Sequence, residues 1–356
     1  MLKPVSFLAL IGMSAAFAPS LAPLRSSRSA TSPRLAAVSG LRIARSSGSF
    51  PTFLPKEMVD IEDEACVAMA ASLRRVPVTV ASEFAVGPIQ TSFTRTECAP
   101  AEGTAPVLML HGFDSSVFEF RRLLPQLEER KIGAWAMDIL GWGFTERAPT
   151  VSSFSKEAKR AHLKAFIEQE IKGPVTLLGA SLGGSVAIDL AIHHPELVQD
   201  LILVDAQAYI DGAAMEGNPR FMKSLGVKVL KTEPLRMFAN KIAYADPDTF
   251  GTPDAMRIGR LHTYDEAWED SMVDFMESGG YRLSERVAEV GQRTTVLWGR
   301  QDKILDPSKY AQRFVDDLPN ASLKWIEDCG HVPHLEQASV TADCIQAHVT
   351  AKVKVA

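Results

Sequence analysis

The N-terminal part of this chain lacks acidic residues, and the first of them is Glu57. The surface of a folded domain normally mixes charges of both signs, so this stretch is not expected to belong to one. It holds an apolar run at residues 5–13 behind Lys3, followed by the small residues Ser14-Ala15-Ala16. This order is typical of a secretory signal peptide, which we predict for residues 1–16.

Residues 17–50 are rich in arginine and serine and contain no acid, which is typical of an organelle transit peptide. Together with the junction Ser14-Ala15-Ala16-Phe17-Ala18-Pro19, they resemble the bipartite presequence of algae whose secondary plastids derive from red algae. We therefore predict a plastid protein whose first ~50 residues are removed, with secretion as the alternative.

Other absences narrow the class of protein further. The four cysteines form no CxxC pair, so neither a disulfide framework nor a cysteine metal site is expected. No apolar run reaches the roughly 18–20 residues that a stable membrane helix needs. The net charge of -5 gives no reason to expect nucleic acid or an anionic membrane surface as a partner. With 46% hydrophobic and 23% charged residues, the chain is suited to one large catalytic domain.

Beyond the presequence, short apolar strands alternate with helices, which predicts an α/β fold with a mostly parallel sheet covered on both faces. A helix is expected at residues 56–74, within an N-terminal segment at 51–75, and then a hairpin at 76–86 and 89–96. The expected core strands lie at 107–110, 133–137, 175–178, 201–204, 294–298 and 322–326. The expected helices lie at 116–130, 156–171, 182–193, 310–318 and 340–349. The core thus occupies residues 76–206 and 286–352, and residues 207–285 form an insertion of the length of a lid.

A nucleophile motif follows the strand at 175–178. It reads Gly179-Ala180-Ser181-Leu182-Gly183, with the order strand, sharp turn, helix that a G-x-S-x-G nucleophile elbow requires. Such a turn raises the serine hydroxyl above the sheet edge at a helix N-terminus, where unpaired N–H groups favour an oxyanion. We predict Ser181 as the nucleophile, and the backbone N–H groups of Phe113 and Leu182 as the oxyanion hole.

A serine needs a base, and its acid and base should follow it in the chain in the order Ser, Asp, His. Asp302 and His331 each follow a core strand, so both should lie at the same sheet edge as Ser181. Asp306 is a rival acid, although its place before Pro307 suits the start of a helix. His334 is a rival base, more typical of a pocket-lining or structural histidine.

Three further residues near these motifs have expected roles. His111 is expected to order the oxyanion loop, and Asp138 is expected to belong to a turn and to bind no metal. Asp114 could point into the site or brace its loop.

The chain from about residue 76 to 349 resembles the α/β-hydrolase superfamily. The matching segments are His111-Gly112-Phe113, Asp138-Ile139-Leu140-Gly141-Trp142-Gly143, Gly179-Ala180-Ser181-Leu182-Gly183-Gly184, Trp298-Gly299-Arg300-Gln301-Asp302 and Gly330-His331-Val332-Pro333. Leu54-Pro55-Lys56-Glu57 and His111-Gly112-Phe113-Asp114-Ser115-Ser116 are similar to plastid members from plants and algae. The resemblance implies a serine hydrolase with the triad Ser181, Asp302 and His331, without metal or organic cofactor. A serine at the elbow argues against epoxide hydrolases and haloalkane dehalogenases, which use aspartate there.

The insertion carries half of the chain's 12 methionines together with many aromatic residues. This composition favours an adaptable apolar pocket, with Phe221, Phe238 and Trp268 as candidate substrate contacts; the alternative is a small core of the insertion itself. The sequence thus predicts a hydrolase of an apolar carboxylic ester, such as a lipid or pigment ester, that uses an acyl-enzyme. A cofactor-free haloperoxidase or perhydrolase, a lipid acyltransferase and a non-catalytic binding module remain alternatives.

Overall fold

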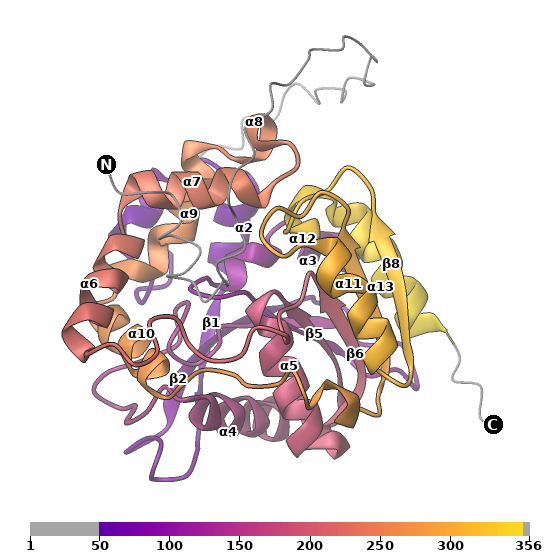
Figure 1. Cartoon of the computed structure of the whole chain (residues 1–356), viewed down its shortest axis with the longest axis horizontal. Coiled ribbons are helices and arrows are strands. Elements are labelled where there is room, and N and C mark those ends of the chain that lie inside the picture. The colour runs from indigo at the N-terminus through magenta and orange to yellow at the C-terminus, as the bar shows by residue number, and fades with distance from the viewer. Residues whose placement is uncertain (1–49, 352–356) are drawn as a thin grey trace.

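The computed structural model describes residues 50–351, and the presequence predicted at residues 1–50 lies almost wholly outside them. One eight-stranded sheet runs through these residues in the order β1-β2-β4-β3-β5-β6-β7-β8 (Figure 1). β1 and β2 pair antiparallel, as does β2 with β4, and all the other neighbours are parallel. The predicted α/β fold with a mostly parallel sheet is confirmed. The strands are β1 (Arg74–Val78), β2 (Ile89–Arg95), β3 (Val107–Leu110), β4 (Ala134–Met137), β5 (Val175–Ala180), β6 (Val198–Val204), β7 (Arg293–Gly299) and β8 (Ala321–Ile326).

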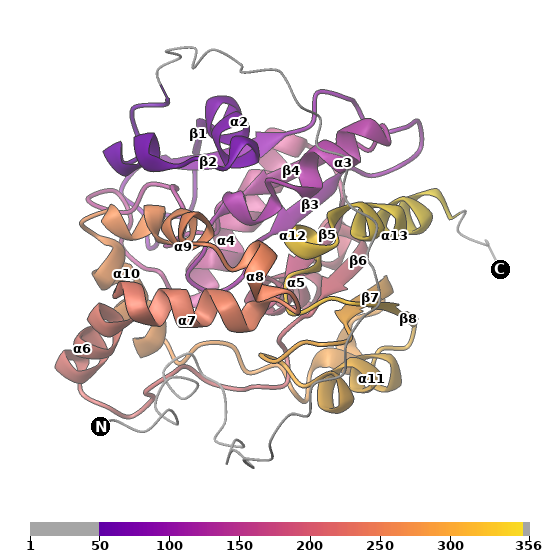
Figure 2. The same cartoon turned by 90° about the horizontal axis from the view of Figure 1, so that it is seen from above.

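Helices cover both faces of the sheet, as Figure 2 shows from above. One face carries α4 (Lys156–Phe166), α5 (Leu182–His193) and α11 (Pro307–Asp317), and the other carries α2 (Glu64–Ser72), α3 (Leu123–Glu129) and α13 (Ala338–Thr350). Every residue of β3 and β5 is buried, because successive side chains enter opposite cores. The central strands are therefore fixed from both sides, and the loops at their carboxyl ends start from rigid positions.

The insertion between β6 and β7 is helical. Its elements are α6 (Arg220–Leu230), α7 (Glu233–Ala243), α8 (Pro247–Phe250), α9 (Pro253–Arg260), the 3₁₀ helix η5 (Leu261–Tyr264) and α10 (Trp268–Glu277). α10 buries Trp268, Met272 and Phe275 in the core shared with the sheet, whereas no residue of α7 is fully buried. α7 is thus only partly covered by the rest of the protein.

The single helix predicted at residues 56–74 is wrong. The chain forms a 3₁₀ turn, η1 (Lys56–Asp60), and then the separate helix α2. Hydrogen bonds to one distant residue and a local cap accompany the break. The N–H groups of Glu62 and Asp63 donate to the carboxylate of Asp254 in α9, and the Asp63 side chain caps α2 through the Cys66 N–H at 2.9 Å.

Several predicted elements differ in their bounds. The hairpin partner of β2 ends at Val78, and the helices expected at 116–130 and 156–171 are each divided: η2 (Val117–Phe120) precedes α3, and the π-helix η3 (Ile167–Ile171) follows α4. The short helices η4 (Pro195–Leu197), η6 (Val287–Glu289) and α12 (Pro333–Glu336) complete the described elements. Across residues 50–351, no helix is both long enough and apolar enough to cross a membrane.

Candidate active site

Ser181 lies in the sharp turn between β5 and α5, in a backbone conformation with φ of +50°. Residues other than glycine rarely adopt a positive φ, so the surrounding structure must hold this turn. The Ser181 N–H donates to Val204 O at 3.0 Å, and its carbonyl accepts from the N–H groups of Gly184 and Gln207. These backbone bonds to β6 and to the loop after it keep the side chain at the sheet edge.

The glycines of the motif are required by close backbone contacts. A Cβ atom at Gly179 would lie 2.4 Å from Gly183 O, and one at Gly183 would lie 2.3 Å from Leu110 O. Any larger residue would push α5 away from β3 and β5. The two glycines therefore allow α5 to pack closely against the ends of β3 and β5.

Two N–H groups flank Ser181 as the oxyanion hypothesis expects. Leu182 is the first residue of α5, and Phe113 lies in the loop after β3. Within residues 50–351, neither backbone N–H is bonded to a protein acceptor. The loop of Phe113 is ordered by His111, whose Nδ1 bonds Gly112 O at 2.9 Å and whose Nε2 accepts from Ile139 N at 3.1 Å. These two bonds order the loop, as expected for His111.

The expected turn role of Asp138 is also seen. The carboxylate of Asp138 accepts the N–H groups of Val117 and Phe144 at 2.8 and 2.9 Å. It braces the loops after β3 and β4 and is fully buried.

Asp302 and His331 meet at the carboxyl ends of β7 and β8. His331 Nδ1 lies 2.8 Å from Asp302 Oδ2, and both residues are buried. The other carboxylate oxygen of Asp302 accepts from the N–H groups of Ile304 and Leu305 at 2.7 and 2.9 Å. With its Nδ1 held by the carboxylate, the imidazole turns its Nε2 away from Asp302, which is the orientation that a general base for serine needs.

A second carboxyl group, Asp205, lies behind this pair at the end of β6. One oxygen each of Asp205 and Asp302 and a ring nitrogen of His331 lie within 4.8 Å of one another. Burial and the negative charge of Asp302 raise the pKa of Asp205 well above its usual range. Asp205 Oδ1 accepts from Gly299 N at 3.0 Å. Asp205 Oδ2 is buried without a hydrogen-bond partner among the described residues, so burial and the nearby Asp302 carboxylate both favour the protonated form of Asp205.

The backbone around His331 is tied to the insertion. The His331 N–H donates to Ala243 O at the end of α7 at 2.7 Å. The buried carboxylate of Glu336 accepts from Gly330 N at 2.7 Å and from the N–H groups of Ala245 and Asp246. The loop that carries the imidazole is thus anchored to the segment that follows α7.

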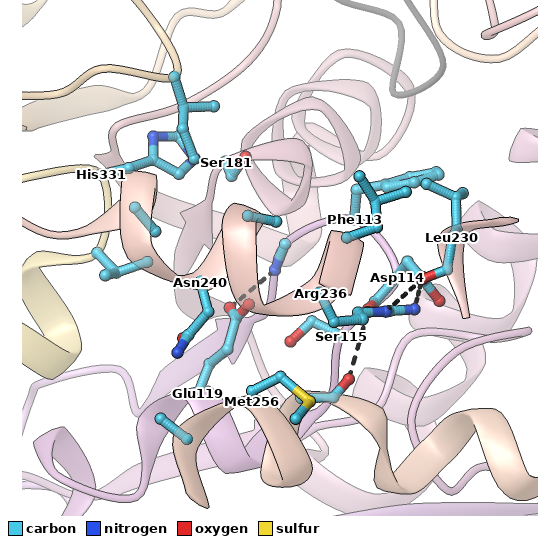
Figure 3. Close-up of a pocket in the computed structure, with 18 of the residues that line it drawn as sticks. Phe113, Asp114, Ser115, Glu119, Ser181, Leu230, Arg236, Asn240, Met256 and His331 are labelled. Atoms are coloured by element: carbon cyan, nitrogen blue, oxygen red, sulfur yellow. Dashed lines mark hydrogen bonds and ion pairs between the residues drawn. The ribbon is translucent and has the colours of Figure 1, made fainter. Parts of the chain in front are cut away.

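These groups border one cavity of about 240 Å³. Figure 3 shows Ser181 beside the imidazole of His331, with Phe113 on the same side of the cavity. The insertion supplies the opposite wall. The lining residues from the insertion are Leu230, Leu235, Arg236, Ala239, Asn240, Ala243, Ala255, Met256 and Gly259. The site therefore has one wall from strand ends and one wall from the inserted helices.

Residues 107–343 match the model of a family described as the alpha/beta hydrolase family. This chain belongs to the alpha/beta hydrolase family. The match spans the strands that precede Ser181, Asp302 and His331, and it identifies the protein as a hydrolase enzyme.

Relatives of this hydrolase include proteins of different names. The alpha/beta hydrolase domain-containing protein VTE7 of Arabidopsis thaliana is 37% identical over 298 residues, which cover 83% of this chain and 89% of the relative. Lipase 1 of Psychrobacter immobilis is 26% identical over 68% of this chain and 76% of its own length. The crystal structure of an esterase from Thermogutta terrifontis has a TM-score of 0.63 at 20% identity, over 77% of this chain and 97% of the esterase. This last likeness shows the fold alone.

Asp114, whose role the sequence left open, joins the two walls of the hydrolase cavity. This residue directly follows Phe113 and has a φ of +50°. Its carboxylate forms an ion pair with Arg236 of α7 and accepts from His262 Nε2 at 2.8 Å and Trp268 Nε1 at 2.7 Å. Burial alone would raise the pKa of Asp114, but Arg236 and His262 lower it to about 2. One buried carboxylate of the oxyanion loop thus binds three separate elements of the insertion.

Glu119 supports the oxyanion loop from the other side, a role that sequence reasoning missed. The segment Ser116-Val117-Phe118-Glu119 has the pattern of a capping box, but the Glu119 carboxylate accepts from Gly112 N at 3.0 Å instead. His334 Nε2 lies 3.6 Å from Glu119 Oε2. Burial opposes ionisation of Glu119, yet His334 lowers the pKa of this carboxyl to about 2. Both side chains line the cavity, so His334 has the pocket-lining position expected for it.

None of the three candidate substrate contacts in the insertion lines the cavity. Phe221 and Phe238 are 71% and 51% exposed and do not line the cavity. Trp268 is buried and donates to Asp114. The apolar pattern of α6 and α7 could not reveal which side faces the protein.

The rival acid Asp306 takes the other role foreseen for it. It caps α11 by accepting the Ser308 N–H at 2.9 Å.

Proposed function

We propose that this hydrolase cleaves a carboxylic ester through a serine acyl-enzyme. His331, oriented by Asp302, takes the proton of Ser181 as the hydroxyl attacks the ester carbonyl. The N–H groups of Phe113 and Leu182 hold the oxyanion, and His331 then protonates the leaving alcohol. Water releases the acid by the same route. The observation that carries the proposal is the convergence of Ser181 and the His331–Asp302 pair on one cavity.

The lining of the cavity favours an apolar substrate, such as a lipid or pigment ester. Leu230, Leu235, Met256 and Ile304 contribute hydrocarbon, and Phe113 adds an aromatic ring. The volume of about 240 Å³ is below the roughly 300–1,000 Å³ typical of pockets for drug-sized ligands. We infer that the cavity holds one arm of the ester and that the remainder lies outside. The name of the lipase relative is consistent with this class of substrate.

The test compares the wild-type enzyme with Ser181→Ala on p-nitrophenyl esters of graded chain length and on chlorophyll-type pigment esters. We expect hydrolysis of at least one apolar ester, reduced by about 10⁴-fold or more in the variant. Unchanged turnover of every hydrolysed ester in Ser181→Ala would contradict the proposal. Product analysis with added alcohol and with peroxide and halide separates hydrolysis from acyl transfer and from haloperoxidase chemistry.

We also propose that the enzyme acts in the plastid. The acid-free, arginine- and serine-rich composition of residues 17–50 supports this location, and a relative in a plant is consistent with it. A fusion of residues 1–60 to a fluorescent protein, expressed in an alga with secondary plastids, is expected to accumulate in the plastid. Export of the fusion into the medium would support secretion instead.

A further inference from the structure

Helix α6 carries an apolar face that points away from the protein. Phe221 and Leu225 are 71% and 63% exposed, and Met222 and Val229 are 40% and 42% exposed. Their spacing of one, four and eight residues places all four on one side of the helix. The opposite side is buried through Val227 and Leu230. We call these four exposed residues the α6 face.

The α6 face adjoins the wall of the catalytic cavity. Leu230, at the end of α6, lines the cavity, and so do Leu235 and Ala239 of the next helix, α7. The outer side of α7 adds Phe238, which is 51% exposed. α6 and α7 thus have apolar side chains both at the protein surface and at the cavity. A single layer of helices separates the apolar surface from the cavity.

Basic side chains flank this apolar surface. Residues 220–243 contain six lysines and arginines and one acid, Glu233, although the whole chain has a net charge of -5. Of the six, Lys223 is buried and Arg236 pairs with Asp114. Arg220 and Lys228 have side chains that are 52% and 62% exposed, and Lys241 is also exposed. Arg220 lies 2.5 Å from Glu277 and 3.1 Å from Asp270, and Lys228 lies 3.4 Å from Glu269. Exposed pairs of this kind are weak and can be exchanged for other anions.

We propose that the α6 face docks on the surface of a lipid bilayer that contains anionic lipids. Exposed phenylalanine and leucine on one side of a helix with flanking lysine and arginine form the pattern of a helix that lies in a bilayer interface. The apolar side chains would enter the interface, and the basic side chains would contact anionic headgroups. A second copy of the chain fits less well, because two α6 faces in contact would bring their basic residues together. The docking is independent of the reaction; only the delivery of an apolar ester from the bilayer to the cavity rests on the proposed function.

The first test measures co-sedimentation of the full chain with phosphatidylcholine vesicles, with and without phosphatidylglycerol. Phe221→Ser/Leu225→Ser is compared with the wild type and with Val86→Ser/Val340→Ser, which alters two exposed valines outside the insertion. We expect the α6 variant to lower the partition coefficient at least about tenfold, while the control variant binds like the wild type. Added phosphatidylglycerol should strengthen binding by the wild type, and high salt should weaken it.

A second measurement reports which part of the chain meets the lipid. Tryptophan is placed on the α6 face in Phe221→Trp and far from it in Val86→Trp. Brominated lipid is expected to quench the added tryptophan at position 221 and to leave the one at position 86 unchanged. Equal quenching at both positions, or equal binding by wild type and α6 variant, would overturn the proposal. An α6 variant that only converts a dimer to a monomer in size-exclusion chromatography would overturn it in favour of self-association. Since neither assay uses an ester, their failure would leave the proposed reaction untouched.

Discussion

The two walls of the cavity are held in place by different means. Ser181, Asp302 and His331 stand on loops at the ends of strands, and hydrogen bonds to neighbouring strands and loops fix them. The inserted wall consists of α7, which has no fully buried residue, of the end of α6 and of α9. It is attached to the first wall by side chains, above all by the ion pair between Asp114 and Arg236, and by the bond from His331 N to Ala243 O.

This difference suggests that the two walls have different roles. In the proposed reaction the strand-end wall holds the reacting groups, whose positions must be accurate to a fraction of an ångström. The inserted wall would hold the substrate and could change with it, since few buried contacts constrain α7. Asp114 lies where the two meet, next to a predicted oxyanion donor. Substitutions in the strand-end wall should therefore lower kcat. Substitutions at Asp114 should lower kcat and also weaken the attachment of the inserted wall.

The largest expected effect is in the strand-end wall. Asp302→Ala should lower kcat by about 10⁴-fold, because His331 loses the carboxylate that orients it. Asp306→Ala is the matched control, four residues further along the chain. It removes the cap of α11, which should cost about 1 kcal/mol of stability and leave kcat unchanged. Steady-state kinetics with thermal unfolding checks both, and equal losses of kcat would contradict the assignment of the acid.

Asp114→Asn should have the next largest effect. The variant loses the ion pair with Arg236 and releases the loop of Phe113, so kcat should fall by roughly 10²–10³-fold, the usual loss for one oxyanion donor. Asp254→Asn serves as the control, since Asp254 also joins the insertion to the core, through the N–H groups of Glu62 and Asp63, but does not line the cavity. It should reduce stability and leave kcat within about twofold. A normal kcat in Asp114→Asn would show that the two walls are uncoupled.

Low pH should weaken the contacts that the carboxylates of Asp114 and Glu119 make. The folded-state pKa values of Asp114 and Glu119 are lowered to about 2, from 3.8 and 4.5. A carboxyl group whose pKa is lower in the folded than in the unfolded state stabilises the fold at pH values above its unfolded-state pKa. That stability is lost as the pH falls through its folded-state pKa. The free energy of unfolding should therefore decrease between about pH 4 and pH 2, and this decrease should be smaller in Asp114→Asn/Glu119→Gln. Urea titrations across this range measure it; an unchanged slope would argue against ionised carboxylates at both positions.

The smallest effect is expected for Asp205→Asn. Asparagine keeps an acceptor for Gly299 N and, like the protonated carboxyl that burial and the charge of Asp302 favour at this position, carries no charge. We expect kcat within about threefold of the wild type at neutral pH. Rate profiles against pH for the two enzymes check this. A loss close to that of Asp302→Ala would mean that Asp205 carries the charge that orients His331.

The sequence predicted the strand-end wall well, because its signals are local. A buried strand followed by Gly179-Ala180-Ser181-Leu182-Gly183 defines a turn, and parallel strands bring their carboxyl ends to one edge. The same logic could have found Asp205, a charged residue directly after the apolar strand at 201–204.

The rest depended on contacts between residues far apart in the chain. The break in the helix predicted at 56–74 is accompanied by bonds to Asp254, about 190 positions away. Phe221 and Phe238 were expected in the cavity, because apolar periodicity gives the side of a helix but not what that side faces. Glu119 formed a plausible capping pattern and instead reached back to Gly112 N. Each error concerns a partner that no local pattern specifies.

The most direct test of the central claim is covalent labelling of the purified enzyme by a fluorophosphonate, followed by intact mass and peptide mapping. One adduct is expected, on Ser181, and it should form at least about 10³-fold more slowly in His331→Ala, because the serine then lacks its base. An adduct on another residue, or equal labelling rates in the two enzymes, would contradict the claim that Ser181 and the His331–Asp302 pair form one catalytic unit.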